Sequence, residues 1–208
     1  MTAARSDEEL MAAYAGGSFE AFEELFERNR RSVFMFLLHH VGERELAEDL
    51  MQDVFLRVVR ARERYVVGSR FRPWLFTIVR NAVTDSHRRR AVRRVVVLEG
   101  DLETGAREEE RERAPSVGAA GLGAQSSAAE QPADLAAAAD LRVAIEAAVA
   151  RLPEEQREVF LLRERGELDF ESIARVTGQG LATVKSRMRY AMAALRRSLS
   201  QLEKVVFE

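Results

Sequence analysis

One segment near the C-terminus, LDFESIARVTGQGLATVKSRMRYAMAALRRSL, constrains the fold of this chain more than any other. Ala174 stands where two helices must cross closely, and Gly178, four residues later, suits the positive-φ position that ends a helix. Val184 stands where a second helix would pack back on the first. These positions predict a helix-turn-helix, but an ordinary helical hairpin with solvated arginines satisfies the same spacings.

The second helix of this unit carries apolar and polar residues on different faces. Its apolar residues recur at spacings of three and four, at Val184, Met188, Met192 and Leu195. Its other positions are cationic or hydrogen-bonding, as a helix that enters the major groove of DNA requires, and comprise Thr183, Lys185, Ser186, Arg187, Arg189 and Tyr190. The rest of the chain has to decide between a DNA-binding unit and a hairpin.

The net charge of −2 is divided unevenly along the 208 residues. Residues 1–94 carry a net charge of +3, residues 95–135 carry −6, and residues 136–208 carry +1. Five arginines occur between His87 and Arg94 without a carboxylate among them. A solvated helix end is one interpretation, but we favour a nucleic-acid surface because like charges repel one another unless a polyanion neutralises them.

The composition argues against several classes of protein. The chain has no cysteine and only three histidines, so we expect no disulfide, no metal site and no cofactor. We find no GxxxxGK loop and no nucleophile paired with a base, and therefore expect neither an enzyme nor a small-molecule substrate. The most apolar run, 33–41, is too short to span a bilayer, and the N-terminus does not resemble a signal peptide. These features favour a cytoplasmic protein without membrane insertion.

The periodicities predict an all-α protein with two small helical domains joined by a flexible acidic linker, the second domain containing the helix-turn-helix. The first domain covers residues 1–95, the linker 96–134 and the second domain 135–208. The linker is rich in Glu, Ala, Gly and Ser and contains Pro115 and Pro132. In the second domain, Pro153, Glu154 and Glu155 are typical of the first turn of a helix.

Two helices are predicted in the first half of the first domain. The first follows Ser18 and ends at Gly42, with His39 and His40 in its last turn, where partly charged imidazoles suit the helix dipole. Its apolar face comprises Phe19, Phe22, Leu25, Phe26, Val33, Phe36, Leu37 and Val41. The second helix has an apolar residue every four positions, at Leu46, Leu50, Val54 and Val58.

Another face of that second helix is acidic and polar. Glu45, Asp49, Gln52 and Asp53 lie together on it. This stripe is either solvated or a docking surface for a basic partner helix, and periodicity alone does not choose between these. Beyond it, VVGSRF interrupts the pattern, and Pro73 then suits the first turn of a basic helix.

With these parts in place, the chain resembles the extracytoplasmic-function sigma factors, a compact class of bacterial RNA polymerase specificity subunit. AEDLMQDVFLRVVRA and SRFRPWLFTIVRNAVTDSHRRR resemble the polymerase-binding and promoter-melting parts of the family's first domain. LPEEQREVFLLRERGELDFESIARVTGQGLATVKSRM resembles its second domain. The resemblance implies a protein that binds core RNA polymerase and promoter DNA and opens the strands, with an anti-sigma factor as a further partner.

The resemblance also implies roles for individual residues. The polymerase-binding residues would be Asp49, Gln52 and Asp53. The minus-10 element would be contacted by a loop and the helix after it, through Tyr65, Gly68, Ser69, Arg70, Arg72, Arg80, Asn81, Thr84, Arg88 and Arg89. The minus-35 element would be read by the six polar residues of the recognition helix, 183, 185–187, 189 and 190. Phe71 and Trp74 fit a core role better than stacking on a flipped base.

The chain departs from the family pattern at several positions. Gln179 replaces a usual apolar residue and Gly180 a usual serine cap, while Tyr190 and Met192 stand where basic residues are common. Val59 replaces a frequent tryptophan. The acidic linker is either a nucleic-acid mimic or a solvated tether. A conventional regulator with a similar helix-turn-helix is the main rival function, but it does not account for the basic helix after the aromatic loop.

Overall fold

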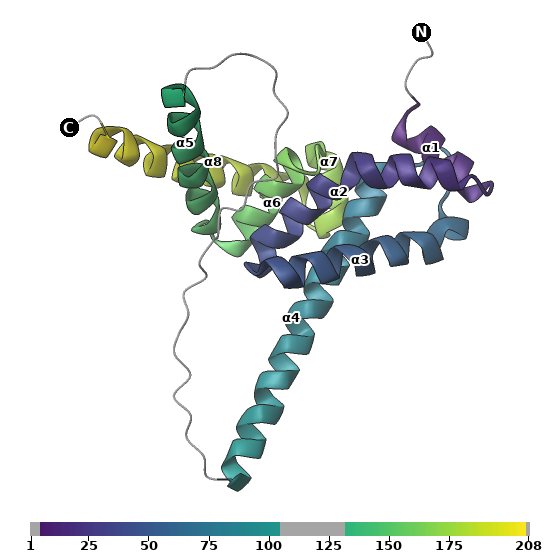
Figure 1. The fold of residues 1–208 in the computed structure, drawn as a ribbon, viewed down its shortest axis with the longest axis horizontal. Helices are drawn as coiled ribbons and strands as arrows, with labels where there is room; N and C mark the ends of the chain where they lie inside the picture. The colour runs from purple at the N-terminus through teal and green to yellow at the C-terminus, as the bar shows by residue number, and fades with distance from the viewer. Residues whose placement is uncertain (1–4, 105–131, 207–208) are drawn as a thin grey trace.

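The computed structural model describes the backbone of residues 5–104 and 132–206 and the side chains of residues 5–91 and 141–200. Every regular element within these ranges is a helix, which confirms the all-α prediction (Figure 1). In chain order the elements are α1 (Asp7–Ala15), α2 (Phe19–Val41), α3 (Arg44–Ala61), the short 3-10 helix η1 (Arg62–Arg64), α4 (Phe71–Thr104), α5 (Pro132–Ala150), α6 (Glu154–Glu164), α7 (Phe170–Thr177) and α8 (Leu181–Val206). None of the described helices combines the length and hydropathy that a bilayer crossing demands.

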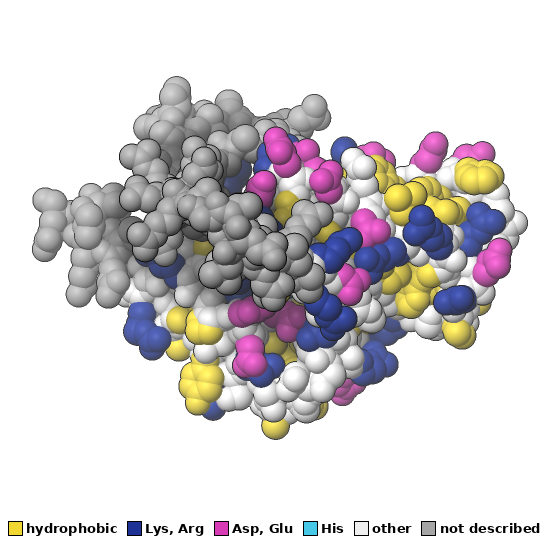
Figure 2. Space-filling view, turned by 90° about the horizontal axis from the view of Figure 1, so that it is seen from below, with side chains coloured by type: hydrophobic (Ala, Val, Ile, Leu, Met, Phe, Trp, Pro, Cys, Tyr) yellow, Lys and Arg dark blue, Asp and Glu magenta, His cyan; other side chains and the backbone are white. Residues whose placement is uncertain are grey.

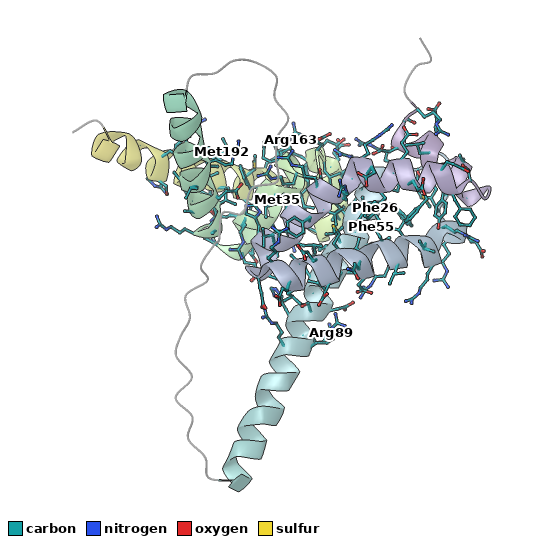
Figure 3. The ribbon with its side chains drawn as sticks, viewed as in Figure 1. Phe26, Met35, Phe55, Arg89, Arg163 and Met192 are labelled. Carbon is teal, nitrogen blue, oxygen red and sulfur yellow. The ribbon has the colours of Figure 1, made fainter. Side chains whose placement is uncertain are left out.

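The first domain is formed by α1 to α4, with α4 packed against both α2 and α3. Its core follows the predicted repeat, because Leu50, Val54 and Val58 are all buried. Phe26 of α2 and Phe55 of α3 meet edge to face with ring centroids 4.7 Å apart (Figure 3). The prediction for Phe19 was wrong. This ring is 69% exposed, because it begins α2 and a helical side chain leans toward the N-terminus, past the end of the packed face.

Capping residues set the predicted ends of α2. The Ser18 hydroxyl accepts a hydrogen bond from the backbone N–H of Ala21 at 3.3 Å, which satisfies one free donor of the first turn. Gly42 has φ of 73° and its N–H donates to the Leu38 carbonyl, so the helix stops where the sequence predicted. Both boundaries of α2 are confirmed.

The fourth helix is longer than the sequence indicated. It begins at Phe71, so Pro73 lies in its first turn as predicted, but it continues to Thr104. Residues 96–104, which were predicted to belong to the linker, thus continue this helix, and the predicted linker residues 105–131 lie outside the part of the chain that the structure describes. Each further residue adds a backbone hydrogen bond to an existing helix without a new nucleation cost, and no proline interrupts this stretch. Figure 1 shows the end of α4 extending beyond the packed helices.

The second domain is formed by α5 to α8 and contains the predicted helix-turn-helix. Gly178 ends α7 with φ of 68°, and Val184 of α8 is completely buried. Asp169 begins α7, because its carboxylate accepts a hydrogen bond from the Ser172 backbone N–H at 2.7 Å. The second domain packs against the first mainly through α7, which lies on α4.

Candidate functional site

The acidic stripe of α3 lies on the surface. Asp49 and Gln52 are exposed, whereas Asp53 is half-buried and forms an ion pair with Arg57 at 2.8 Å. Burial opposes the charge of Arg57, but its hydrogen bonds to Asp53 and to Asp85 raise its pKa. The predicted polymerase-binding residues therefore share one accessible face.

Sequence reasoning missed an apolar residue on the same face of α3. Leu56 follows Gln52 by four residues and Asp53 by three, and its side chain is 52% exposed. The four-residue repeat that predicted the core includes Val54 and Val58 and passes over Leu56, so Leu56 was not predicted to be buried. The signal that could have identified Leu56 is a large apolar side chain that does not belong to the core repeat and lies one turn after the acidic stripe.

The polar residues predicted on α4 divide between two faces. Asn81, Thr84 and Arg88 follow one another at spacings of three and four and are exposed. Arg89 is also exposed, and it lies where α4 leaves the body of the molecule (Figure 3). Arg80 points elsewhere, because its Nε donates to Glu158 of α6 at 2.8 Å. The structure thus brings four of the predicted minus-10 residues onto accessible parts of α4 and directs Arg80 toward the second domain.

The loop before α4 has an ordered internal structure. The hydroxyl of Tyr65 donates to the Ser69 carbonyl at 2.5 Å, and the Ser69 hydroxyl donates to the Val66 carbonyl at 2.6 Å. Gly68 has φ of 89°, a conformation that a side chain would strain. The loop therefore holds Val66 and Val67 outward, where they are 72% and 69% exposed.

The aromatic residues around this loop form a small core. Tyr65 is only 5% exposed, and its ring lies 5.2 Å from that of Trp74 and 6.4 Å from that of Phe71. Burial raises the pKa of the Tyr65 phenol. Tyr65 was predicted as a DNA contact, but in this conformation its ring has no free face on which a base could stack. Tyr65 instead stabilises the loop through its buried ring and its hydrogen bond to the Ser69 carbonyl.

Two further predicted minus-10 residues, Arg70 and Arg72, contact the second domain. Arg70 forms an ion pair with Asp169 at 2.5 Å and donates to the Ser172 hydroxyl at 3.2 Å. Arg72 forms an ion pair with Glu167 in the turn between α6 and α7. The hydrogen bond from Arg70, with the one from the Ser172 N–H, holds the pKa of Asp169 far below its usual range.

The recognition helix α8 presents most of its predicted residues to the surface. Thr183, Lys185, Arg189 and Tyr190 are exposed, and the Arg189 guanidinium lies 5.2 Å from the Tyr190 ring centroid. Ser186 is half-buried. Arg187 differs from the others, because it forms an ion pair with Glu155 of α6 at 2.6 Å and its side chain is only 18% exposed.

A cavity of about 330 Å³ lies between the domains and is lined by Phe36, His40, Arg80, Val83, Thr84, His87, Glu154, Glu155, Glu158, Gln179 and Arg187.

His40 donates from Nδ1 to the Phe36 carbonyl at 2.8 Å, and burial lowers its pKa to about 4. The expectation of a partly charged imidazole was wrong for His40, which is neutral at pH 7. His39 contacts Glu146 of α5 instead, and this hydrogen bond lowers the pKa of that carboxyl.

The described residues contain no group of three His, Cys, Asp or Glu side chains arranged to hold a metal ion. Basic and acidic side chains adjoin one another on the face seen in Figure 2, instead of forming separate fields.

Comparison with known proteins identifies both domains. Residues 25–93 match the family Sigma-70 region 2, and residues 142–195 match the family Sigma-70, region 4. RNA polymerase sigma factor CarQ of Myxococcus xanthus is 47% identical over 78 residues, which cover 38% of this chain and 45% of that protein, less than half its length. ECF RNA polymerase sigma factor SigL of Mycobacterium tuberculosis is 31% identical over 183 residues, which cover 86% of this chain and 88% of that protein.

Among solved structures, the sigma factor RpoE in complex with the anti-sigma factor NepR from Bartonella quintana has a similar fold. The TM-score is 0.59 at 23% sequence identity, and the match covers 87% of this chain and 98% of that one. The two family matches, in the order and spacing of the two helical domains described above, together with the relatives, show that the chain belongs to the extracytoplasmic-function RNA polymerase sigma factors.

Proposed function

We propose that this sigma factor binds core RNA polymerase through α3, contacts the minus-10 element through α4 and the loop before it, and reads the minus-35 element through α8. The observation that carries the proposal is the presence of two exposed polar rows on separate domains of one chain. The row on α4 comprises Asn81, Thr84 and Arg88, and the row on α8 comprises Lys185 and Arg189, one helical turn apart. Two rows on separate domains suit two separate promoter elements.

The polymerase surface combines charge with apolar contact. Asp49 and Gln52 offer acceptors to a basic partner helix, and Leu56 adds an apolar side chain that contact would remove from water. The half-buried Asp53 is held by Arg57 and so has a fixed position on the stripe. These properties suit a helical partner that lies across α3.

The minus-10 surface has groups suited to bases and others suited to phosphates. Asn81 can pair with a base edge, whereas Arg88 and Arg89 supply affinity for the backbone that depends on salt. The loop of residues 65–72 would receive an unstacked base, with Gly68 and Ser69 at its tip and the exposed Val66 and Val67 as apolar contacts. In this proposal Tyr65 positions the loop and does not stack on the base.

An anti-sigma factor is a further proposed partner. The solved complex of RpoE with the anti-sigma factor NepR has a matching fold for the sigma chain, and this supports the proposal without identifying the partner here. The protein would act where RNA polymerase acts, in the cytoplasm, and we propose no bond-making or bond-breaking step of its own.

The function is tested by sequencing transcripts that core polymerase makes from genomic DNA with and without the protein. We expect new start sites preceded by two shared sequence elements at minus-10 and minus-35. If no new start sites are made, the proposed function is wrong.

The melting role is tested separately with Asn81→Ala on promoter DNA. We expect fewer open complexes by permanganate footprinting, by about tenfold for one lost base contact. Replacing 67–70 with Gly and Ser residues should act in the same way, with polymerase binding retained. A template already mismatched across minus-10 is the control, since it should restore much of the activity. Normal permanganate reactivity on paired DNA in both variants would rule out the role.

A further inference from the structure

The first helix of the chain, α1, lies outside the residues that match Sigma-70 region 2, since that match begins at residue 25. Its residues Leu10, Met11 and Tyr14 are nevertheless buried in the core of the first domain. α1 contacts both η1 and α4, and the chain that follows α3 runs toward its side (Figure 1). This helix therefore adjoins both ends of the loop of residues 65–72, the part of the molecule proposed to receive the unstacked base.

One side chain of α1 reaches the first residue of α4. The Glu8 carboxylate accepts a hydrogen bond from the Phe71 backbone N–H at 3.0 Å, across 63 residues of sequence. Phe71 begins α4, so this N–H is one of the donors that a helix cannot satisfy internally. A carboxylate at this end also interacts favourably with the helix dipole. Glu8 thus does for α4 what a capping side chain normally does from an adjacent residue.

The first turn of α1, which carries Glu8, is fixed on two sides. Ser6 and Glu9 form a reciprocal cap, in which the Ser6 N–H donates to the Glu9 carboxylate at 2.7 Å and the Glu9 N–H donates to the Ser6 hydroxyl at 3.2 Å. Arg28 of α2 forms an ion pair with Asp7 at 3.0 Å. The carboxylate of Glu8 therefore projects from a well-anchored turn.

The loop is held at both of its ends. Tyr65 at the start is buried and donates to the Ser69 carbonyl, and its ring lies 6.4 Å from that of Phe71. Phe71 at the far end is also buried and is bound by Glu8 through its N–H. Burial raises the pKa of the Tyr65 phenol, and the charge of Glu8 acts in the same direction. The two supports therefore meet in one aromatic cluster.

We propose that Glu8 is a positioning residue for capture of the unstacked minus-10 base. By holding the first turn of α4, it fixes the loop of residues 65–72 in the conformation that receives the base. The inference rests on the proposed function, since it takes this loop as the site of base capture. A loop that is ordered beforehand loses little conformational freedom when the base binds, so the ordering offsets less of the contact free energy.

The surroundings of Glu8 agree with an action through the loop and not on the DNA. A carboxylate that faced the DNA would repel the phosphates, whereas this one is half-buried and directed at a backbone donor of its own domain. Arg72, the residue after Phe71, lies 3.8 Å from Asp7, so a cation stands beside the acidic first turn of α1. The negative charge of this turn is thus met within the protein.

The test uses three variants of the full chain. Glu8→Ala removes the acceptor, and Glu8→Gln keeps an acceptor oxygen without the charge. Glu9→Ala is the matched control, because it removes the same charge from the next residue and weakens the cap of α1 but leaves the bond to Phe71 in place. Melting temperatures of the free proteins report any loss of fold. If Glu8→Ala does not fold, the comparison is made with Glu8→Gln.

Fork DNA distinguishes capture of a base from general binding. Complexes of each variant with core polymerase are titrated with a promoter fork whose non-template minus-10 bases are unpaired. The titration is repeated with forks in which one of these bases at a time is replaced by an abasic site. The abasic position that weakens binding of the unmodified protein most identifies the captured base.

On the intact fork we expect Glu8→Ala to weaken binding about tenfold, Glu8→Gln about threefold and Glu9→Ala less than about twofold. On the fork that is abasic at the captured position, all three should bind within about twofold of the unmodified protein, because the contact made by the loop has already been lost. Trp74, the only tryptophan of the chain, has its ring 5.2 Å from that of Tyr65. Its fluorescence should be more accessible to acrylamide in free Glu8→Ala.

Unchanged affinity of Glu8→Ala for the intact fork would overturn the proposal, as would equal losses on intact and abasic forks, since a weakened fold affects both alike. Equal losses in Glu8→Ala and Glu9→Ala would also overturn it. Stronger binding by Glu8→Ala would place the carboxylate against the DNA and not on the loop. Failure of the proposed function gives a different pattern, in which the unmodified protein itself binds the intact fork and every abasic fork equally.

Discussion

The two domains both present arginines and other polar residues that we propose to contact DNA, but they differ in what surrounds those charges. On α8, Lys185 and Arg189 are exposed to solvent. Arg70, just before α4, and Arg80, in the third turn of α4, are each paired with a carboxylate of the other domain. In sequence these arginines look like the cations of α8. The difference teaches that the tertiary partner, and not the residue type, decides which cations are ready to bind.

The largest effect we predict concerns α3, whose acidic and polar face is exposed to solvent, as are the cations of α8. Asp49→Lys with Asp53→Lys should weaken binding to core polymerase by at least about 100-fold, because both acceptors of a basic partner become repulsive. Co-purification with core enzyme and a titration of the labelled protein measure the loss. Glu23→Lys with Glu63→Lys is the matched control and should bind normally.

The double variant should keep its fold. Helix content by circular dichroism should be unchanged, since Arg57 retains its ion pair with Asp85 at 2.9 Å. Undiminished co-purification would show that the stripe is merely solvated.

A second prediction uses His40, which lines the cavity between the domains, to compare a closed form, in which the domains are in contact, with an open form, in which they are apart. Burial lowers the pKa of this imidazole to about 4, and Arg157, His39 and His87 add positive potential in the same direction. Opening exposes the ring, so its pKa should return toward the ordinary value of about 6.5. The open form then takes up a proton that the closed form excludes.

The sign of the pH effect follows from this difference. The contribution of His40 to the closed form is complete above about pH 6.5 and is lost as the pH falls toward 4. Between about pH 8 and about pH 5 the closed form should weaken about 30-fold relative to the open form through this group.

NMR titration of the histidine rings measures this effect. Glu158→Gln, Glu167→Gln and Asp169→Asn together remove three carboxylates from the contact between the domains and should raise the His40 pKa, and His40→Gln should remove the part of the pH dependence that belongs to this ring. A His40 that titrates near 6.5 in the unmodified protein would refute the closed arrangement around it.

Much of the fold could be predicted because its signals are local. Gly42 and Gly178 take the positive φ that their positions in the pattern required, and Pro73 lies in the first turn of α4. The burial of Leu50 and Val54 follows from a repeat within one helix. Signals of this kind depend on residues that lie within a few turns of each other.

The candidate site was predictable only in part, because partners far apart in sequence decide it. Arg80 and Asn81 are neighbours in the chain, but Arg80 is paired with Glu158, 78 residues away, whereas Asn81 is exposed. The positions of the buried Phe76 and Val83, at −4 and +3 from Arg80, place that arginine beside the apolar face. Nothing in the sequence states that a second domain would cover that edge.

A third prediction compares Lys185 and Arg187, two cations on the same helix. Lys185 is exposed, so Lys185→Ala should weaken binding to minus-35 duplex DNA about tenfold, within the range of about 1 to 3 kcal/mol for a base contact. Arg187 is held by Glu155, so Arg187→Ala should have a smaller effect on the free protein. Binding to matched and scrambled duplexes across a salt series distinguishes base contacts from phosphate contacts.

The ion pair between Arg187 and Glu155 can be tested by substituting Glu155 and, as a control, its neighbour Glu154. Glu155→Gln should free Arg187 and strengthen duplex binding by about two- to fivefold, whereas Glu154→Gln removes the same charge without freeing it. Equal effects of the two substitutions would mean that net charge alone controls binding. If Lys185→Ala and Arg187→Ala both leave binding unchanged, α8 is not the recognition helix.

The smallest predicted effect concerns the N-terminus of α8 itself. Asp169 caps α7 through its carboxylate, whereas Gly180 precedes α8 and has no side chain to offer. A Cβ at Gly180 would meet only the Thr183 hydroxyl, at 3.9 Å, so a serine fits there. Gly180→Ser should therefore stabilise the domain by a few tenths of a kcal/mol, seen as a rise in Tm of about 1 °C. Gly178→Ser is the matched contrast: its φ of 68° disfavours any side chain, so it should cost about 1 kcal/mol. A fall in Tm with Gly180→Ser would show that a serine at this position does not cap the N-terminus of α8.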